Sequence, residues 1–467
     1  MAEIVIIGAG SLVFSSRLTA DILTYPEMQN SHFRLVDTDA LRLRYAEQIV
    51  QRIFKEGGYT QAEVSAYDDR REALKGADYV IISILVGGYE AIEKEIDIAK
   101  KYGIDQCIGD TLTPGGIMRC IRTLPILQEM AMDIQELCPD AVVLNYTNPM
   151  GMLSKGFVEA APDVQYVGLC HSVQGTAQEW ADRLKISLEE INYLCAGINH
   201  EAWFTKFEHN GTDLLPAIRK LAVKPEIWYG DSTRMEYVKH LGYPVTESSG
   251  HVSEYNPWFR KNDETIRRYC PSEISEWNGG FGFIKKLYDR PDWKEQMQKM
   301  ADWEDPIDLE RSHEYGSQII HALETGETTI IYGNVMNQGY IDNLPNDAVV
   351  EVPCLVNKNG IQPVSVGKIP PHLAAINRTQ LNVQELAVLA VQESDPERIF
   401  QAMALDPLTA MSCTLDEIRA MTRELMEAHG EWIPVMKGRI PDDKPLVYLQ
   451  KPEGAVEKHI DPAKANQ

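Results

Sequence analysis

The chain has 467 residues, of which 44% are hydrophobic and 24% are charged, a composition typical of a soluble globular protein with a large core. Its 69 acidic and 45 basic residues leave a formal net charge of -24, which disfavours binding to nucleic acid or to anionic membranes. No stretch approaches the roughly 18 apolar residues that a membrane span requires. The eight cysteines form no Cys-x-x-Cys pair, so we expect no disulfide framework and a cytoplasmic location.

The N-terminus predicts a strand, a glycine turn and a helix. Residues 3–8 form a short apolar run, and a turn with Gly8, Gly10 and Ser11 precedes a helical pattern that extends to about Leu23. Backbone N–H groups at such a helix start can bind a pyrophosphate. We therefore predict that Gly8, Gly10 and Ser11 contact a dinucleotide.

Two positions bear on which dinucleotide binds. Position 13, where the usual fingerprint has a third glycine, is Val13. Asp37 ends the second predicted strand, where a carboxylate can accept hydrogen bonds from both ribose hydroxyls of NAD and repel the 2'-phosphate of NADP. We predict NAD, although Asp37 as a loop carboxylate or a helix cap is the simpler alternative.

The remaining elements of this half alternate between strands and helices. Strands are predicted at 33–36, 63–67, 78–84, 141–146 and 164–169, and helical patterns at 40–54, 115–137 and 175–185. Apolar strands that alternate with helices indicate a parallel sheet with both faces covered. The prediction is an α/β fold, with a Rossmann-like doubly wound NAD-binding domain over residues 1–196.

After about residue 200 the pattern changes. Aromatic residues and prolines cluster at 224–260, helical patterns occupy 307–325 and 380–430, and a strand-rich segment lies at 328–368. We predict a C-terminal α+β domain over 197–467 that carries substrate, metal and oligomer contacts. The polar end, 452–467, is predicted to fray.

Side chains that follow predicted strands are candidates for chemistry, because ligands of such sheets bind at the carboxyl ends of the strands. Asn148 follows the fifth strand, Cys170 and His171 follow the sixth, and His200 ends a later segment. A thiolate and a neutral imidazole could hold a divalent metal. The alternatives are a buried thiol, a structural histidine and an Asn-Pro turn at Asn148.

Two further candidates lie in loops. Asp110 stands in a glycine-rich loop before a helix, where an acid could equally cap the helix. The run 247–258 is dense in titratable and aromatic side chains, which suits a loop that lines a ligand. Tyr255 in this run could act as a base beside a metal, because a cation favours the phenolate. Without a metal, Tyr255 would be ordinary packing.

Several long motifs in order give the chain a specific resemblance to glycoside hydrolase family 4, the NAD-dependent glycosidases. They are Gly8-Ala9-Gly10-Ser11, Asp110-Thr111-Leu112-Thr113-Pro114-Gly115-Gly116-Ile117, Asn145-Tyr146-Thr147-Asn148-Pro149-Met150, Gly168-Leu169-Cys170-His171-Ser172-Val173-Gln174-Gly175-Thr176, Ala196-Gly197-Ile198-Asn199-His200, Thr246-Glu247-Ser248-Ser249 and Ile331-Tyr332-Gly333-Asn334. The resemblance covers essentially the whole chain and lies within the alpha-galactosidase branch. It implies an architecture like that of lactate and malate dehydrogenases.

The resemblance also implies a mechanism with no net redox change. NAD takes a hydride from C3 of the sugar, and a base, which matches Tyr255, then removes the acidified hydrogen from C2. Mn2+, held by residues that match Cys170 and His200, binds the C2 and C3 oxygens and stabilises the enolate. The aglycone leaves, water adds and the hydride returns. Asn148 is expected to contact the sugar.

The acid that assists the leaving group is less defined by the resemblance. Phospho-glycosidases of the family have Cys-Asp where this chain has Cys170-His171, so the role falls to His171 or Asp110. Those members also carry an arginine before the Gly-Gly of the fourth strand, where this chain has residues 83–86, Ser-Ile-Leu-Val. An unphosphorylated sugar, such as the galactose of melibiose, is therefore the expected substrate.

Three alternatives remain open from the sequence. A related specificity for α-glucosides or α-uronides is one, and a basic residue near C6, such as Arg119 or Arg260, would favour a uronide. A 2-hydroxy acid dehydrogenase is another, since the architecture is shared, and an NAD-sensing regulator is the third. Family members self-associate, so we expect a homo-oligomer, either a dimer or a tetramer.

Overall fold

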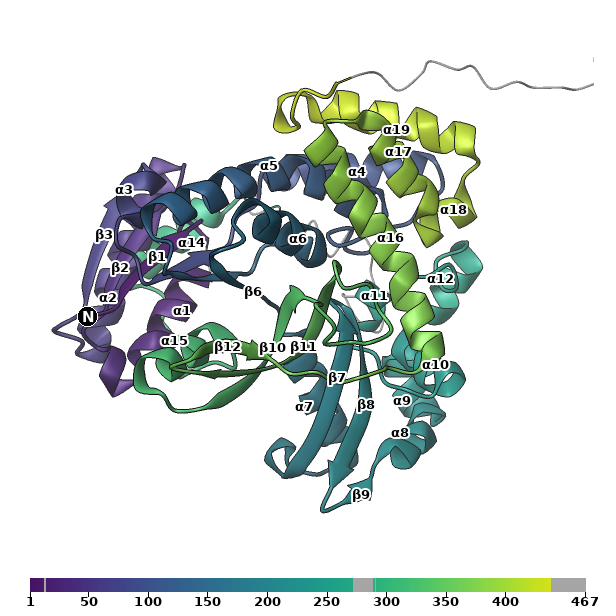
Figure 1. The fold of residues 1–467 in the computed structure, drawn as a ribbon, viewed down its shortest axis with the longest axis horizontal. Helices are drawn as coiled ribbons and strands as arrows, with labels where there is room; N and C mark the ends of the chain where they lie inside the picture. Colours follow the sequence, from purple (N-terminus) through teal and green to yellow (C-terminus); the bar gives the residue numbers. More distant parts are fainter. Residues whose placement is uncertain (12–13, 272–288, 290, 438–467) are drawn as a thin grey trace, which may run out of the picture.

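The structure is a computed structural model, and it describes residues 1–11, 14–271, 289 and 291–437 (Figure 1). Val13 and the predicted frayed end at 452–467 lie outside the described residues. Within these ranges the strands form one 12-stranded sheet, in the order β3-β2-β1-β4-β5-β6-β10-β11-β7-β8-β9, with β12 paired to β11. None of the described helices is both long and apolar enough to cross a membrane.

The N-terminal part of the sheet is parallel, as predicted. Its strands are β1 (Glu3–Ile7), β2 (His32–Val36), β3 (Glu63–Tyr67), β4 (Tyr79–Ile82), β5 (Val142–Asn145) and β6 (Gln165–Leu169). The intervening helices are α1 (Phe14–Leu23), α2 (Ala40–Gly57), α3 (Arg70–Leu74), α4 (Gly88–Lys101), α5 (Thr113–Leu137), α6 (Met150–Ala160) and α7 (Ser172–Leu184), with a 3-10 turn, η1 (Pro26–Met28). The central strands β1, β4 and β5 are short, largely apolar and almost wholly buried because both faces of the sheet are covered there, whereas the edge strand β3 is partly exposed. The predicted Rossmann-like α/β fold is confirmed.

The C-terminal part continues the same sheet with antiparallel strands. These are β7 (Ile191–Ile198), β8 (Glu201–His209), β9 (Thr212–Asp213), β10 (Thr329–Met336), β11 (Val349–Asn357) and β12 (Gly360–Pro363). β10 pairs with β6 through Gly333 opposite Leu169 and Asn334 opposite Gly168, which joins the two halves. The division at residue 196 stays a prediction, because one sheet runs through both sides of it.

Helices pack around this extended sheet (Figure 1). They are η2 (Leu188–Glu190), α8 (Leu215–Ala222), α9 (Pro225–Gly230), α10 (Ser232–Leu241), α11 (Ser249–Val252), α12 (Asp263–Tyr269), α14 (Trp293–Ala301), α15 (Tyr315–Thr325), α16 (Pro371–Glu393), α17 (Pro396–Leu405), α18 (Pro407–Ser412), α19 (Leu415–His429) and η4 (Gly430–Trp432). α16 packs against α5 and α6, and α14 packs against α2, so helices of the C-terminal half cover the N-terminal part.

Two predicted helical patterns differ from the observed helices. The pattern at 307–325 is helical only from Tyr315, because the backbone N–H of Ser312 bonds to the Asp21 carboxylate (2.9 Å) instead of continuing a helix. The pattern at 380–430 is divided into α16, α17, α18 and α19. The breaks follow helix-start signals: Asp395 and Asp406 cap helices that begin with proline, and Thr414 forms a capping box.

Candidate functional site

The glycine turn after β1 packs so closely against its neighbours that a side chain at Gly8 or Gly10 would clash with them. Gly8 has φ +87°, and a Cβ there would lie 1.9 Å from the carbonyl oxygen of Ser83. A Cβ on Gly10 would lie 2.6 Å from the Cβ of Arg42. Ser11 accepts a hydrogen bond at Oγ from the N–H of Phe14 (3.4 Å), at the start of α1. Glycine is therefore required at both positions by the packing of the turn against Ser83 and Arg42, and the contact of this turn with a dinucleotide remains a prediction.

Asp37 lies beside this turn at the end of β2. Its Oδ2 accepts a hydrogen bond from the N–H of Gly10 (2.7 Å), and its Oδ1 accepts one from the N–H of Asp39 (2.9 Å). Each carboxylate oxygen has further lone pairs, so these bonds orient the group and leave capacity for ribose hydroxyls. The ribose contact of Asp37 remains a prediction, now placed next to the glycine turn.

Cys170 and His200 meet at the carboxyl end of β6. The Cys170 Sγ lies 3.3 Å from the His200 Nε2. His200 stands in the turn between β7 and β8 and has φ +64°. Glu247 joins them, with its Oε2 3.6 Å from the same nitrogen. The ligand atoms of these three residues all lie within 4.8 Å of one another. A thiol, an imidazole and a carboxylate converging at one point form a donor set that suits a divalent metal.

The ionisation of these three groups fits such an ion. Burial, and secondarily His251, lowers the pKa of His200, which keeps its imidazole neutral as a ligand must be. Burial opposes ionisation of Glu247, but His200 and the hydrogen bond with His251 lower its pKa below the usual range. Burial raises the pKa of the Cys170 thiol to about 11, so a nearby cation is what would turn it into a thiolate.

Asp110 lies at the centre of a buried hydrogen-bond network. Its Oδ1 is 2.9 Å from the Nε2 of His251 and accepts a hydrogen bond from the Thr111 hydroxyl (2.8 Å), and its Oδ2 accepts one from the Asn148 amide (3.3 Å). His251 also lies 3.4 Å from Glu247 through Nδ1. Burial is outweighed by these charges, which lower the pKa of Asp110 and raise that of His251 well above its ordinary value. The proton of the pair therefore resides on His251.

Tyr255 faces the other side of His200. Its hydroxyl lies 3.1 Å from the His200 Nδ1, and the Thr111 hydroxyl lies 2.8 Å from the same nitrogen. When Nε2 faces the thiol or an ion, Nδ1 carries the hydrogen and can donate to the Tyr255 oxygen. The tyrosine is fully buried, and burial followed by the charges of Asp110 and Glu254 raises its pKa well above the ordinary value. A cation beside it would be needed for the phenolate to form.

The other predicted residues are placed differently. Asn148 is half-buried beside Asp110, and its Oδ1 has no hydrogen-bond partner among the described residues, which leaves one acceptor unused by the protein. The His171 side chain is 66% exposed and lies 3.6 Å from Glu314, outside the Asp110 network. Arg260 donates to Asp105 at its backbone oxygen (2.9 Å) and at Oδ1 (3.1 Å), and to the Ser253 hydroxyl (3.0 Å).

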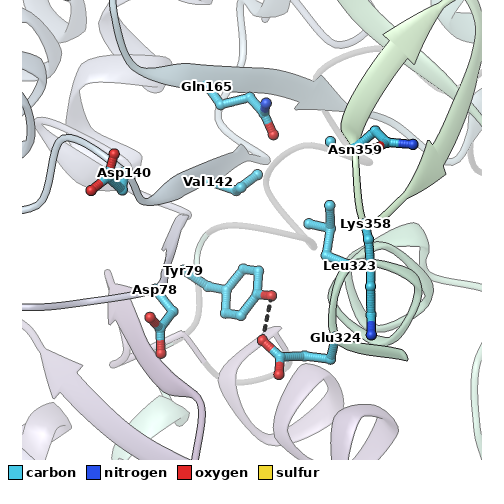
Figure 2. Close-up of a pocket in the computed structure, with 10 residues that line it drawn as sticks. Asp78, Tyr79, Asp140, Val142, Gln165, Leu323, Glu324, Lys358 and Asn359 are labelled. Atoms are coloured by element: carbon cyan, nitrogen blue, oxygen red, sulfur yellow. Dashed lines mark hydrogen bonds between the residues drawn. The ribbon is translucent and has the colours of Figure 1, made fainter. Parts of the chain in front are cut away.

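A surface hollow of about 390 Å³ lies elsewhere in the fold (Figure 2). It is lined by Asp78, Asp140 and Gln165 at the amino ends of β4, β5 and β6, and by Glu324, whose carboxylate accepts a hydrogen bond from Tyr79 (2.7 Å). None of the predicted site residues lines it. The candidate site instead occupies the opposite, carboxyl edge of the sheet, where ligands of this fold class bind.

Sequence reasoning missed part of this site. Glu247 and His251 belong to the run that was expected to line a ligand, yet neither was singled out as a ligand or a proton carrier. Thr111 and Glu254 were likewise missed. Local sequence signals carry little information on such residues, because their roles depend on partners as far as 147 residues away.

The sequence matches two family descriptions along most of its length. "Family 4 glycosyl hydrolase" covers residues 3–186, and "Family 4 glycosyl hydrolase C-terminal domain" covers residues 195–409. An alpha-galactosidase of Bacillus subtilis (strain 168) is 38% identical, over 94% of this chain and 100% of the relative. An alpha-galactosidase of Rhizobium meliloti (strain 1021) is 37% identical, over 92% of this chain and 89% of the relative. An alpha-galacturonidase of Thermoanaerobacterium saccharolyticum (strain DSM 8691 / JW/SL-YS485) is 32% identical, over 78% and 81%.

Solved structures share the fold. A crystal structure of 6-phospho-alpha-glucosidase from gut microorganisms in complex with NAD and Mn2+ has a TM-score of 0.77 at 20% identity, over 93% of this chain and 99% of the other. Malate dehydrogenase from Cryptosporidium parvum has a TM-score of 0.52 at 13% identity, over 84% and 99%. The predicted dehydrogenase-like architecture is thereby confirmed as a likeness of fold.

Proposed function

Because the chain belongs to family 4 of the glycosyl hydrolases, we propose that it is an α-galactosidase that hydrolyses melibiose-type α-galactosides with bound NAD and Mn2+. Membership of this family supports a glycoside hydrolase and argues against the two other predicted functions, a 2-hydroxy acid dehydrogenase and an NAD-sensing regulator. The galactosidase relatives support the sugar, and the complex of the structural neighbour with NAD and Mn2+ supports the cofactors.

The glycine turn with Asp37 would hold NAD, and Cys170, His200 and Glu247 would hold the ion. Together these cofactors supply reversible oxidation at C3 of the sugar and stabilisation of negative charge on its C2 and C3 oxygens. The protein's own side chains orient the sugar and move two protons.

Tyr255 removes the hydrogen from C2, and the His200 N–H, 3.1 Å from its oxygen, stabilises the phenolate that does so. The Asp110–His251 pair delivers a proton to the departing oxygen. Asn148 orients the sugar through the acceptor that the protein leaves unused. Burial of the whole network strengthens each of these interactions.

The observation that carries the proposal is the single histidine that joins the base to the candidate metal site. His200 presents Nε2 to Cys170 and Nδ1 to Tyr255, so the proton acceptor and the charge-stabilising ion would lie on opposite sides of one ring. A dehydrogenase that only transfers hydride has no need of a tyrosine base next to a thiolate ligand.

The alpha-galactosidase relatives, 38% and 37% identical, favour a neutral sugar over a uronide, since the alpha-galacturonidase of Thermoanaerobacterium saccharolyticum is 32% identical. Arg260 already bonds to Asp105 and Ser253, so its guanidinium is occupied by the protein. Arg119 is buried, and it lowers the pKa of Asp110.

The test measures hydrolysis of p-nitrophenyl α-galactoside with NAD, Mn2+ and a reductant, each omitted in turn. Dependence on all three is expected, together with rates on the α-glucoside and the α-galacturonide that are lower than on the α-galactoside. Full activity of protein stripped of both cofactors would refute the mechanism, and faster cleavage of the galacturonide would refute the assigned sugar.

We also propose that the enzyme is cytoplasmic and forms a homo-oligomer, either a dimer or a tetramer. The eight cysteines, none of which forms a disulfide bond, support a reducing compartment. Sedimentation equilibrium tests the assembly, and a monomer at micromolar concentration would contradict it.

A further inference from the structure

We infer that Glu254 is a positioning residue that sets the place of Asp110 from the same segment that carries Tyr255. The inference rests on the proposed function, because it takes Asp110 as part of the proton donor and Tyr255 as the base. Glu254 itself touches neither of these side chains in any hydrogen bond of the structure. It acts through the backbone of residues 107–109, which directly precede Asp110.

The Glu254 carboxylate accepts hydrogen bonds from three consecutive backbone N–H groups. Its Oε2 accepts hydrogen bonds from Cys107 (2.6 Å) and Ile108 (3.2 Å), and its Oε1 accepts one from Gly109 (2.9 Å). The side chain is fully buried. Hydrogen bonds from N–H groups to a carboxylate are among the strong ones in proteins, and their cost when broken is high in a site that excludes water.

The loop needs such a partner because it has no regular structure of its own. Residues 102–112 connect α4 to α5 without helix or strand, so their N–H groups are not bonded in a ladder. Gly109 takes φ +63°, which turns the chain into Asp110. Without the carboxylate, three buried N–H groups would lack their acceptor, and the loop would have to shift to find another.

A second contact from the same segment also supports a positioning role for Glu254. Arg260 bonds to Asp105 and to the Ser253 hydroxyl, so the stretch 253–260 holds the loop at two points on either side of Gln106. One peptide bond separates Gly109 from Asp110, and one separates Glu254 from Tyr255. The hydrogen bonds from residues 107–109 to Glu254 therefore fix how far Asp110 lies from Tyr255.

The test exploits the fact that an acid matters most for a poor leaving group. Glu254→Gln keeps the shape but places an amide donor among the three N–H donors. We expect its kcat to fall about tenfold more on methyl α-galactoside than on p-nitrophenyl α-galactoside, since general acids contribute roughly 10²–10⁴-fold and small displacements forfeit much of this. Asp110→Asn should show the same bias, and the double variant should show no further bias beyond Asp110→Asn.

The control is Asn337→Ala. Asn337 is a fully buried side chain that holds another loop, donating to the carbonyls of Ile341 (3.0 Å) and Leu344 (3.1 Å), away from the Asp110 network. The loss of this side chain should lower the stability of the protein and change kcat by the same factor on both substrates. If Glu254→Gln does not fold, Glu254→Asp should show a smaller bias of the same kind. This variant keeps the carboxylate, but its side chain is shorter by one methylene.

The outcomes separate the inference from the function. Equal losses on both substrates in Glu254→Gln or Glu254→Asp, with the bias intact in Asp110→Asn, overturn the positioning role alone. A bias from Glu254→Gln that persists undiminished in the Asp110→Asn background overturns it as well. A parent enzyme that cleaves no α-galactoside, or an Asp110→Asn variant without bias, overturns the proposed roles and the inference with them.

Discussion

Replacing Tyr255 with phenylalanine tests the base most directly. The change removes one hydroxyl, whose oxygen lies 3.1 Å from the His200 Nδ1, and leaves the buried ring in place. A net hydrogen bond contributes about 0.5–1.5 kcal/mol to stability. A general base contributes roughly 10²–10⁴-fold, and a factor of 100 corresponds to about 2.7 kcal/mol of activation free energy. The loss of rate should therefore exceed anything that the loss of stability could cause.

The assay follows the C2 hydrogen. Hydrolysis in deuterium oxide is monitored by proton NMR, and the parent should incorporate deuterium at C2 of the released sugar. Tyr255→Phe should lower both kcat and the rate of C2 exchange by roughly 100-fold or more.

The matched control is Tyr237→Phe. Tyr237 is also a buried tyrosine, and its hydroxyl accepts a hydrogen bond from Asn256 (2.8 Å). This variant should lose a similar amount of stability and keep its C2 exchange. Exchange in Tyr255→Phe within a few-fold of the parent would show that another group removes the hydrogen.

Three further predictions concern the metal, the dinucleotide and the pH. Cys170→Ser should retain less manganese than the parent after dialysis, whereas Cys354→Ser, a buried thiol in β11, should retain it fully; equal content in both would remove Cys170 as a ligand. Asp37→Ala should weaken NAD binding by roughly 10- to 100-fold in a fluorescence titration, as expected for lost bonds to a charged group, and an unchanged Kd would contradict the ribose contact. In metal-free protein, the folded pKa of His251 is raised above its ordinary 6.5, so its stabilising contribution is full below that value and is lost as the pH rises through the raised pKa. The difference in unfolding free energy between parent and His251→Gln should shrink with rising pH, and a difference that grows would refute the ion pair with Asp110.

Much of the N-terminal half was predictable because its signals are local. A strand, a turn and a helix follow one another within about twenty residues, and the apolar runs show where each strand lies. The ends of those strands also indicated Asn148 and Cys170, because parallel strands present their carboxyl ends at one edge. The helices at 371–429 were harder to predict, since their apolar spacing continues across the capped breaks at Asp395 and Asp406.

The sequence by itself determined the dinucleotide fold, the thiol–imidazole pair as a candidate for metal binding and the tyrosine as a candidate base. Only the tertiary structure decided that His251 meets Asp110 across 141 positions and that Glu254 holds the loop of Asp110 from 145 to 147 positions away. The reason is physical: periodicity reports which face of an element is buried, whereas the partner of a buried charge depends on how distant segments pack. The same packing sets which of two neighbouring groups keeps the proton.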